Sequence, residues 1–155
     1  MERIVRQRQF LHIIPDVTWK ELVDKYVLPN GRITGEAPVL AADIIIAYNV
    51  QGVVNNGGFA YFFGADFPGM KHSQIAETFR RLRLEEHAVI IDQMVELFPD
   101  DLLQQTPEAR FPFLEERFAW DRVDQRNLDV KKADIYFWDQ SESVYTILDE
   151  LADTL

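Results

Sequence analysis

The stretch between residues 38 and 51 constrains the fold most strongly, because a helix there is apolar on nearly every side. Pro38 suits its first turn, since the proline ring fixes a helical φ and the missing N–H would have no partner there. The apolar positions are Val39, Leu40, Ala41, Ala42, Ile44, Ile45, Ile46, Ala47 and Tyr48. A helix that is apolar all round belongs inside a core, so we predict that it ends near Gln51 and forms the centre of the protein.

Helical periodicity continues on both sides of this segment. Thr18 and Glu21 have the spacing of a capping box, which predicts a short helix over residues 19–27 that ends before Pro29. Further helices are predicted from Ser73, with Ile75, Phe79 and Leu82 inward, and over residues 85–98, 112–126 and 141–152. The pattern predicts an all-α fold, a single multi-helix domain over residues 1–155 around a buried central helix, with residues 1–17 as a short extended N-terminal arm.

Composition narrows the class of protein. A chain of 155 residues has the size of one domain and can bury roughly 70% of the surface of its unfolded form. There is no cysteine, which excludes disulfides, thiolate metal sites and cysteine-dependent catalysis. The N-terminus lacks the apolar segment of a signal peptide, and the apolar stretch 37–47 is shorter than the roughly 20 residues of a membrane-spanning helix. We expect a soluble, cytoplasmic protein with no membrane association.

The net charge of −10 is concentrated in one part of the chain. Residues 91–155 carry sixteen acidic and six basic groups, which accounts for the whole excess. Such a field repels the phosphates of nucleic acid and attracts basic protein surfaces, so we expect no direct nucleic-acid binding and a basic protein partner. The alternative is that the acidity serves only to keep the protein soluble.

No catalytic or metal-binding pattern is present. The three histidines, His12, His72 and His87, share no ligand spacing, and no H-E-x-x-H occurs. The nucleophile elbow, the P-loop and the dinucleotide-binding glycine pattern are also missing. We therefore predict no catalytic residues, no metal, no cofactor and no enzymatic activity.

The run Asn55, Asn56, Gly57, Gly58 and Phe59 follows the predicted central helix. Asn and Gly tolerate positive φ, so the physical interpretation is a tight reversal that leads into a cluster of aromatic residues over the core. A double glycine also lets a ligand approach the backbone, with the asparagine side chains lining the site. The sequence favours the structural interpretation and leaves the ligand site as an alternative.

The sixteen residues 48–63 resemble the signature of a bacterial family of helical domains of unknown function, in which V-N-N-G-G-F precedes paired aromatic residues. The resemblance implies a family-like helical core over residues 36–126, and it makes residues 127–155 an acidic C-terminal extension. One member of that family is described as a DNA mimic that binds a transcription factor. The chain departs from the family pattern at Tyr61, where Gln is common, and at residues 64–65, where an Asn is common.

A DNA mimic displays carboxylates at phosphate-like intervals. Asp121 and Asp124 have the three-residue spacing of neighbours on a helix face, and three more aspartates follow at five-residue intervals. The predicted protein-binding residues are Asp121, Asp124, Asp129, Asp134 and Asp139.

These observations leave three functional hypotheses. The first is a non-enzymatic acidic protein-binding domain, of the DNA-mimic kind, that docks a basic DNA-binding protein. The second is an immunity-type inhibitor that uses the same surface against a basic toxin. The third is a small-molecule-binding protein or enzyme that uses the Asn-Asn-Gly-Gly-Phe turn. The sequence does not distinguish a monomer from a homodimer.

Overall fold

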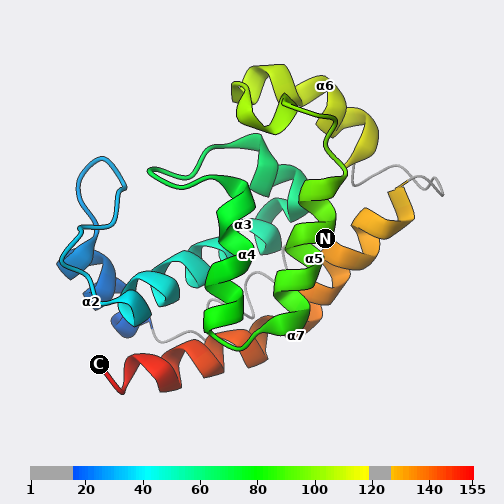
Figure 1. The fold of residues 1–155 in the computed structure, drawn as a ribbon. Helices are drawn as coiled ribbons and strands as arrows, with labels where there is room; N and C mark the ends of the chain where they lie inside the picture. Colours follow the sequence, from blue (N-terminus) through cyan, green and yellow to red (C-terminus); the bar gives the residue numbers. More distant parts are fainter. Residues whose placement is uncertain (1–15, 119–126) are drawn as a thin grey trace.

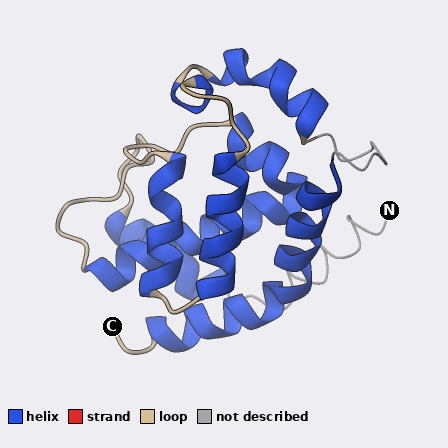
Figure 2. Cartoon of the chain, turned by 45° about the vertical axis from the view of Figure 1, so that its right-hand side comes forward, coloured by secondary structure: helices blue, strands red, loops and turns tan. Residues whose placement is uncertain are grey.

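The computed structural model describes residues 16–118 and 127–155, and within these ranges every regular element is a helix (Figures 1 and 2). The only pairings of β type among the described residues are two isolated bridges, Val27 with Ile33 and Phe67 with Met70. The predicted all-α fold is confirmed. The predicted arm lies outside the described residues up to residue 15, and residues 16 and 17 instead begin the first described helix, α2 (Asp16–Tyr26).

Helix α3 (Val39–Gly64) is the central element, as predicted. It packs against α2, α4 (His72–Arg81), α6 (Pro107–Arg117) and α7 (Leu128–Ala152). The predicted end near Gln51 is wrong, because the helix continues to Gly64 across a kink. Only Gly58 leaves the helical conformation, with φ 69° and ψ −168°, so the Asn-Asn-Gly-Gly run redirects the helix instead of ending it.

Helices α4 and α5 (Glu85–Glu96) form a helical pair beside α3. The predicted inward residues of the first, Ile75, Phe79 and Leu82, are all buried. Ser73 is not the cap, because the helix begins one residue earlier and the side chain of Gln74 accepts the backbone N–H of Lys71 at 2.9 Å.

The C-terminal part of the chain holds α6 (Pro107–Arg117) and α7 (Leu128–Ala152). The prediction of a helix starting at Pro112 is wrong, because Thr106 caps the backbone N–H of Ala109 and Pro107 occupies the first turn. The predicted last helix is also too short, since α7 begins at Leu128 instead of Ser141. Helix α7 packs along α3, and this packing turns the polar stretch 127–134 into its first turns.

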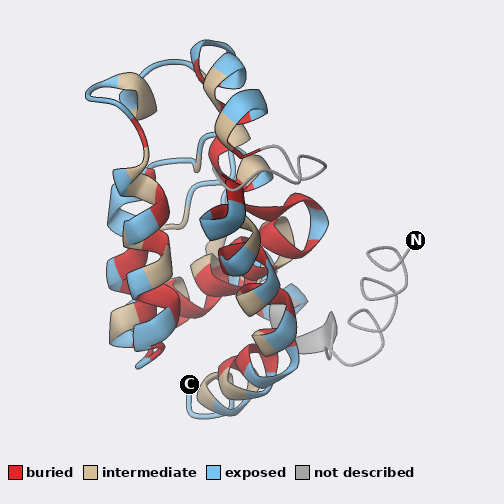
Figure 3. Ribbon diagram, turned by 90° about the vertical axis from the view of Figure 1, so that its right-hand side faces the viewer, coloured by how far each residue is buried: buried red, intermediate tan, exposed pale blue. Residues whose placement is uncertain are grey.

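The core lies where α3, α4, α5 and α7 meet. Its largest side chains are aromatic, and the edge of Phe59 packs on Phe137 with the ring centroids 5.1 Å apart. Phe63 makes a tilted contact with Phe98 and an edge contact with Phe118, with ring centroids 4.6 and 5.3 Å apart. Figure 3 shows the buried residues on the inner sides of the helices and the exposed residues on the outer sides. Burial of these rings is the main stabilising contribution to the fold.

Candidate protein-binding surface

The Asn-Asn-Gly-Gly-Phe turn lies at the junction of α3 and α7, where buried polar groups join the two helices. The Asn55 carboxamide oxygen accepts hydrogen bonds from Gln51 Nε2 at 3.0 Å and from Ser141 Oγ at 2.8 Å. Nearby, the indole N–H of Trp138 donates to the Val54 carbonyl at 2.8 Å. The side chain of Asn55 is thus engaged within the protein, because buried polar groups need such partners.

Asp134 closes this junction at the kink. Its carboxylate accepts the backbone N–H of Phe59 at 2.8 Å. A Cβ atom on Gly58 would lie only 2.5 Å from Asp134 Oδ2, so the carboxylate occupies the space that a side chain would fill. Gly57 is constrained in a similar way, because a Cβ there would overlap the ring of Tyr61. Gly58 therefore serves the packing of α7 against α3, and Gly57 leaves room for the Tyr61 ring within α3. The side chain of Asn56 is exposed.

The placement of Asp134 on an exposed acidic face is wrong, since this residue is only 2% exposed. The reason is helical geometry. Once α7 starts at Leu128, a step of five residues rotates the chain by about 500°, and two such residues lie about 140° apart around the helix. Asp129, Asp134 and Asp139 therefore cannot share one face.

The other predicted residues have different positions. Asp121 and Asp124 lie outside the described residues. Asp129 is exposed, but both its oxygens are bound by Arg117, at 2.8 and 2.6 Å, and this guanidinium lowers the pKa of the carboxyl group. Asp139 is exposed. Of the five predicted aspartates, only Asp129 and Asp139 are therefore shown at the surface.

A different set of carboxylates follows the outer side of α7. Asp139, Glu142, Glu150 and Asp153, which we call the α7 acidic stripe, are all exposed. Their spacings of three, eight and three residues keep them on one side of the helix. No Lys or Arg occurs after Lys132. Glu142, Glu150 and Asp153 make no ion pair within the described part of the chain, so their charges are not offset by a neighbouring cation.

A second acidic region covers residues 84–116, which we call the α5–α6 acidic segment. Its exposed carboxylates are Glu85, Glu86, Glu96, Asp100, Asp101, Glu108, Glu115 and Glu116. The one basic residue in this range is Arg110, which is completely buried. Its guanidinium donates to the Phe63 carbonyl at 2.7 Å and pairs with Asp66. Arg110 thus holds the loop after α3 and, being buried, adds no positive charge to the surface of the segment.

Helix α5, which carries part of the α5–α6 acidic segment, contacts α7 (Figure 1). The Tyr136 hydroxyl donates to Glu86, and the Tyr136 ring packs on His87 with centroids 5.1 Å apart. A shallow cavity of about 260 Å³ lies here, lined by Glu85, Glu86, Gln140 and Ser143 among others, with Arg83 as its basic residue. Burial lowers the pKa of His87 to about 4, so this imidazole is neutral at pH 7.

The described residues contain no group of three or more His, Asp or Glu side chains arranged to hold a metal ion. None of the described helices combines the length and the apolar character needed to cross a membrane. The exposed carboxylates of the α7 acidic stripe can pair with cationic groups.

The fold and this surface define the class of protein, an all-α domain with an acidic exterior. The chain belongs to the DMP19-like protein family, whose sequence profile matches residues 36–150. The family is that of DNA mimic protein 19, which suggests a protein of the DNA-mimic type. The match begins at residue 36, where the family-like core was predicted to begin, and it continues past the predicted end of that core at residue 126. Most of the predicted C-terminal extension, residues 127–155, therefore lies inside the match. Comparisons with curated proteins and with solved structures found no match.

Sequence reasoning did not select Glu142, Glu150 and Asp153 or the carboxylates of the α5–α6 acidic segment. A usable signal was present in the sequence, because Lys and Arg are missing after Lys132 and between residues 84 and 109. A search for long basic-free segments would have found both regions, whereas a search for regular spacing selected Asp134.

Proposed function

We propose that this protein is a non-enzymatic DNA mimic whose acidic surface docks a basic DNA-binding protein. The observation that carries the proposal is the α7 acidic stripe, where Glu142, Glu150 and Asp153 are exposed without an ion-pair partner among the described residues. Uncompensated carboxylates in such a row repel nucleic acid and attract the basic groups that bind phosphates.

The dimensions of the stripe support mimicry. Asp139 and Glu150 are eleven residues apart, which is about 16–17 Å along a helix. Five phosphate steps along one strand of B-DNA cover about 17 Å. A protein that contacts phosphates over half a turn of DNA therefore meets carboxylates over a similar length on α7.

The stripe is also rigid, which mimicry requires. The opposite side of α7 is buried against α3 through Val144, Tyr145 and Leu148. The Tyr48 hydroxyl of α3 donates to Asp149, which fixes the C-terminal half of α7 at a second point. Carboxylates on a packed helix keep their spacing when a partner approaches, so little ordering is needed for binding.

The test replaces three charges without changing side-chain shape. The variant combines Glu142→Gln, Glu150→Gln and Asp153→Asn, and a matched control combines Glu21→Gln, Asp24→Asn and Glu36→Gln, which are exposed and lie outside both acidic regions. Both variants change the net charge by the same amount. The binding partner in the test is a basic DNA-binding protein of the host. It is captured by affinity on this protein and purified, and it qualifies when this protein displaces it from duplex DNA.

The stripe variant should associate at least several-fold more slowly with that protein and show a flatter salt dependence, because rim charges act mainly on the association rate. The control variant should behave like the parent. Equal effects of the two variants would mean that only net charge matters, and the proposed docking surface would then be wrong. Capture of a nuclease toxin in place of a DNA-binding regulator would identify the protein as an immunity-type inhibitor.

A further inference from the structure

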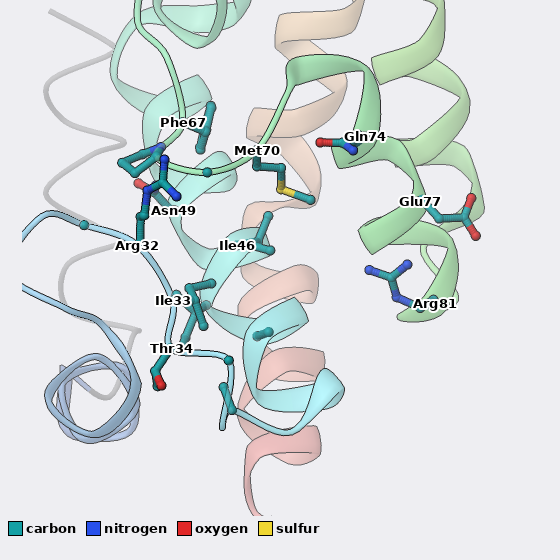
Figure 4. Close-up of a pocket in the computed structure, with 17 residues that line it drawn as sticks. Arg32, Ile33, Thr34, Ile46, Asn49, Phe67, Met70, Gln74, Glu77 and Arg81 are labelled. Carbon is teal, nitrogen blue, oxygen red and sulfur yellow. The ribbon is translucent and has the colours of Figure 1, made fainter.

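We propose that a cavity between two glycine turns and helices α3 and α4 binds a small amphipathic molecule with one anionic group. The cavity has a volume of about 720 Å³ (Figure 4). Sites for small molecules in proteins usually measure about 300–1,000 Å³, so the space is sufficient. The cavity shares no residue with the α7 acidic stripe, and the proposal is independent of the docking function.

Two loops distant in the sequence form one wall of this cavity by packing on each other. Gly31 has φ 82°, and a Cβ there would lie 3.0 Å from Pro68 Cγ. Gly69 has φ 76°, and a Cβ there would lie 3.7 Å from Arg32 Cγ. Each glycine thus supplies a positive φ for its own turn and brings its backbone close to the other loop.

Backbone hydrogen bonds fix both loops, so the cavity is formed before any ligand binds. In the first loop, Leu28 N–H donates to the Arg32 carbonyl and Thr34 N–H to the Tyr26 carbonyl, each at 2.8 Å. In the second, Met70 N–H donates to the Phe67 carbonyl at 3.2 Å. A preformed wall reduces the ordering that a ligand must induce.

The inner surface is apolar where it meets α3 and polar at its edge. Ala42, Ile45 and Ile46 of α3 line the cavity, together with Phe67 and Met70 of the second loop. The side chains of Asn49 and Gln74 reach the same space and supply hydrogen-bonding groups (Figure 4). This combination suits a ligand with an apolar body and a polar end.

The charged groups around the cavity favour an anion. Three charged residues line it, Arg32, Glu77 and Arg81. Arg81 is held by the buried Asp43 through bonds of 2.9 and 2.7 Å, and Glu77 lies 3.5 Å from Arg80 Nη1. Arg32 is exposed and makes no ion pair within residues 16–118 or 127–155. One cation therefore remains at the rim of the cavity in a chain with a net charge of −10.

The probes are decanoate and decyltrimethylammonium, which carry the same apolar chain with opposite charge. Each is titrated below its micelle concentration into the full-length isotope-labelled protein, and backbone amide shifts are followed by NMR. Decanoate should cause saturable shifts at Thr34, Asn49, Gly69 and Met70, and the cationic probe should bind there at least tenfold more weakly. Shifts that do not saturate, or that spread over the whole surface, would overturn the proposal.

Two variants separate the cavity from general adhesion of the probe. Arg32→Gln should weaken decanoate binding about tenfold, while the control Lys20→Gln, which removes an exposed cation from α2, should leave it unchanged. Ala42→Phe should block binding by filling the cavity. If Arg32→Gln and Lys20→Gln bind decanoate equally well, the assignment of the anionic group is wrong.

Discussion

The two sides of α7 use carboxylates in opposite ways. On the inner side Asp134 is 2% exposed and accepts the backbone N–H of Phe59 beside the Gly58 kink. On the outer side Glu142 and Glu150 are exposed and make no ion pair within the described ranges. The inner carboxylate is part of the fold, because a buried acceptor without its partner is costly. The outer ones contribute little to the fold and remain available to a partner.

This difference separates the family signature from the functional surface. The signature residues Asn55, Gly58 and Phe59 are engaged by Ser141 and Asp134 of α7, so their main effect is on the packing of two helices. A substitution on the inner side should therefore change stability first. A substitution on the outer side should change binding with little effect on stability.

The largest expected effect comes from Gly58→Ala. The values φ 69° and ψ −168° lie in a region that is almost restricted to glycine, and the added Cβ would overlap the Asp134 carboxylate. We expect a loss of about 3–5 kcal/mol in the free energy of unfolding, measured by urea titration with circular dichroism.

Gly52→Ala is the matched control in the same helix. Its φ is not positive, and a Cβ would meet its nearest neighbour, Tyr145 Oη, at 3.9 Å. Alanine is favoured over glycine inside a helix, so this variant should be more stable by about 0.5–1 kcal/mol. If both variants lose similar stability, the kink does not have the structural role assigned to it.

The second effect is a dependence of stability on pH that comes from His87. Burial lowers its pKa from about 6.5 in the unfolded chain to about 4 in the folded protein. Between these values the unfolded state binds the proton and the folded state does not. The stability that depends on a neutral His87 is therefore fully present above about pH 6.5. It is lost as the pH falls toward 4, which lowers the free energy of unfolding by about 2–3 kcal/mol.

His87→Leu isolates this contribution. His72 and Asp129 also have lowered pKa values, from burial and from Arg117 respectively, and they add acid sensitivity of the same sign. In the variant, the acid sensitivity that comes from His72 and Asp129 should remain, and the acid sensitivity that comes from His87 should disappear. Urea titrations at pH 7.5 and 4.5 compare the two proteins, and an equal loss of stability in both would exclude His87 as the source.

The smallest effect on stability is expected on the outer side of α7. The variant that combines Glu142→Gln, Glu150→Gln and Asp153→Asn should change the free energy of unfolding by no more than about 0.5 kcal/mol, because exposed unpaired groups contribute little. Thermal unfolding followed by circular dichroism gives this comparison. A loss near that of Gly58→Ala would show that the stripe belongs to the fold and would remove the contrast between the two sides.

The sequence by itself determined the helical class, the central helix and the buried side of α4. The apolar pattern of residues 39–48 predicted the central helix, and the spacing of Ile75, Phe79 and Leu82 predicted the buried side of α4. It also indicated the positive φ in the glycine turn. These features depend on neighbours a few positions away, which periodicity and turn chemistry report directly.

Only the tertiary structure decided which polar groups are used inside the protein. Asp134 is buried because its hydrogen-bond partner, Phe59 N–H, lies 75 residues away, and Asp129 meets Arg117 across the gap between α6 and α7. The cavity likewise depends on the contact of Gly31 with Pro68. Local patterns carry no information about such long-range pairs. The sequence could therefore place acidic charge in the C-terminal half but could not tell a structural carboxylate from an exposed one.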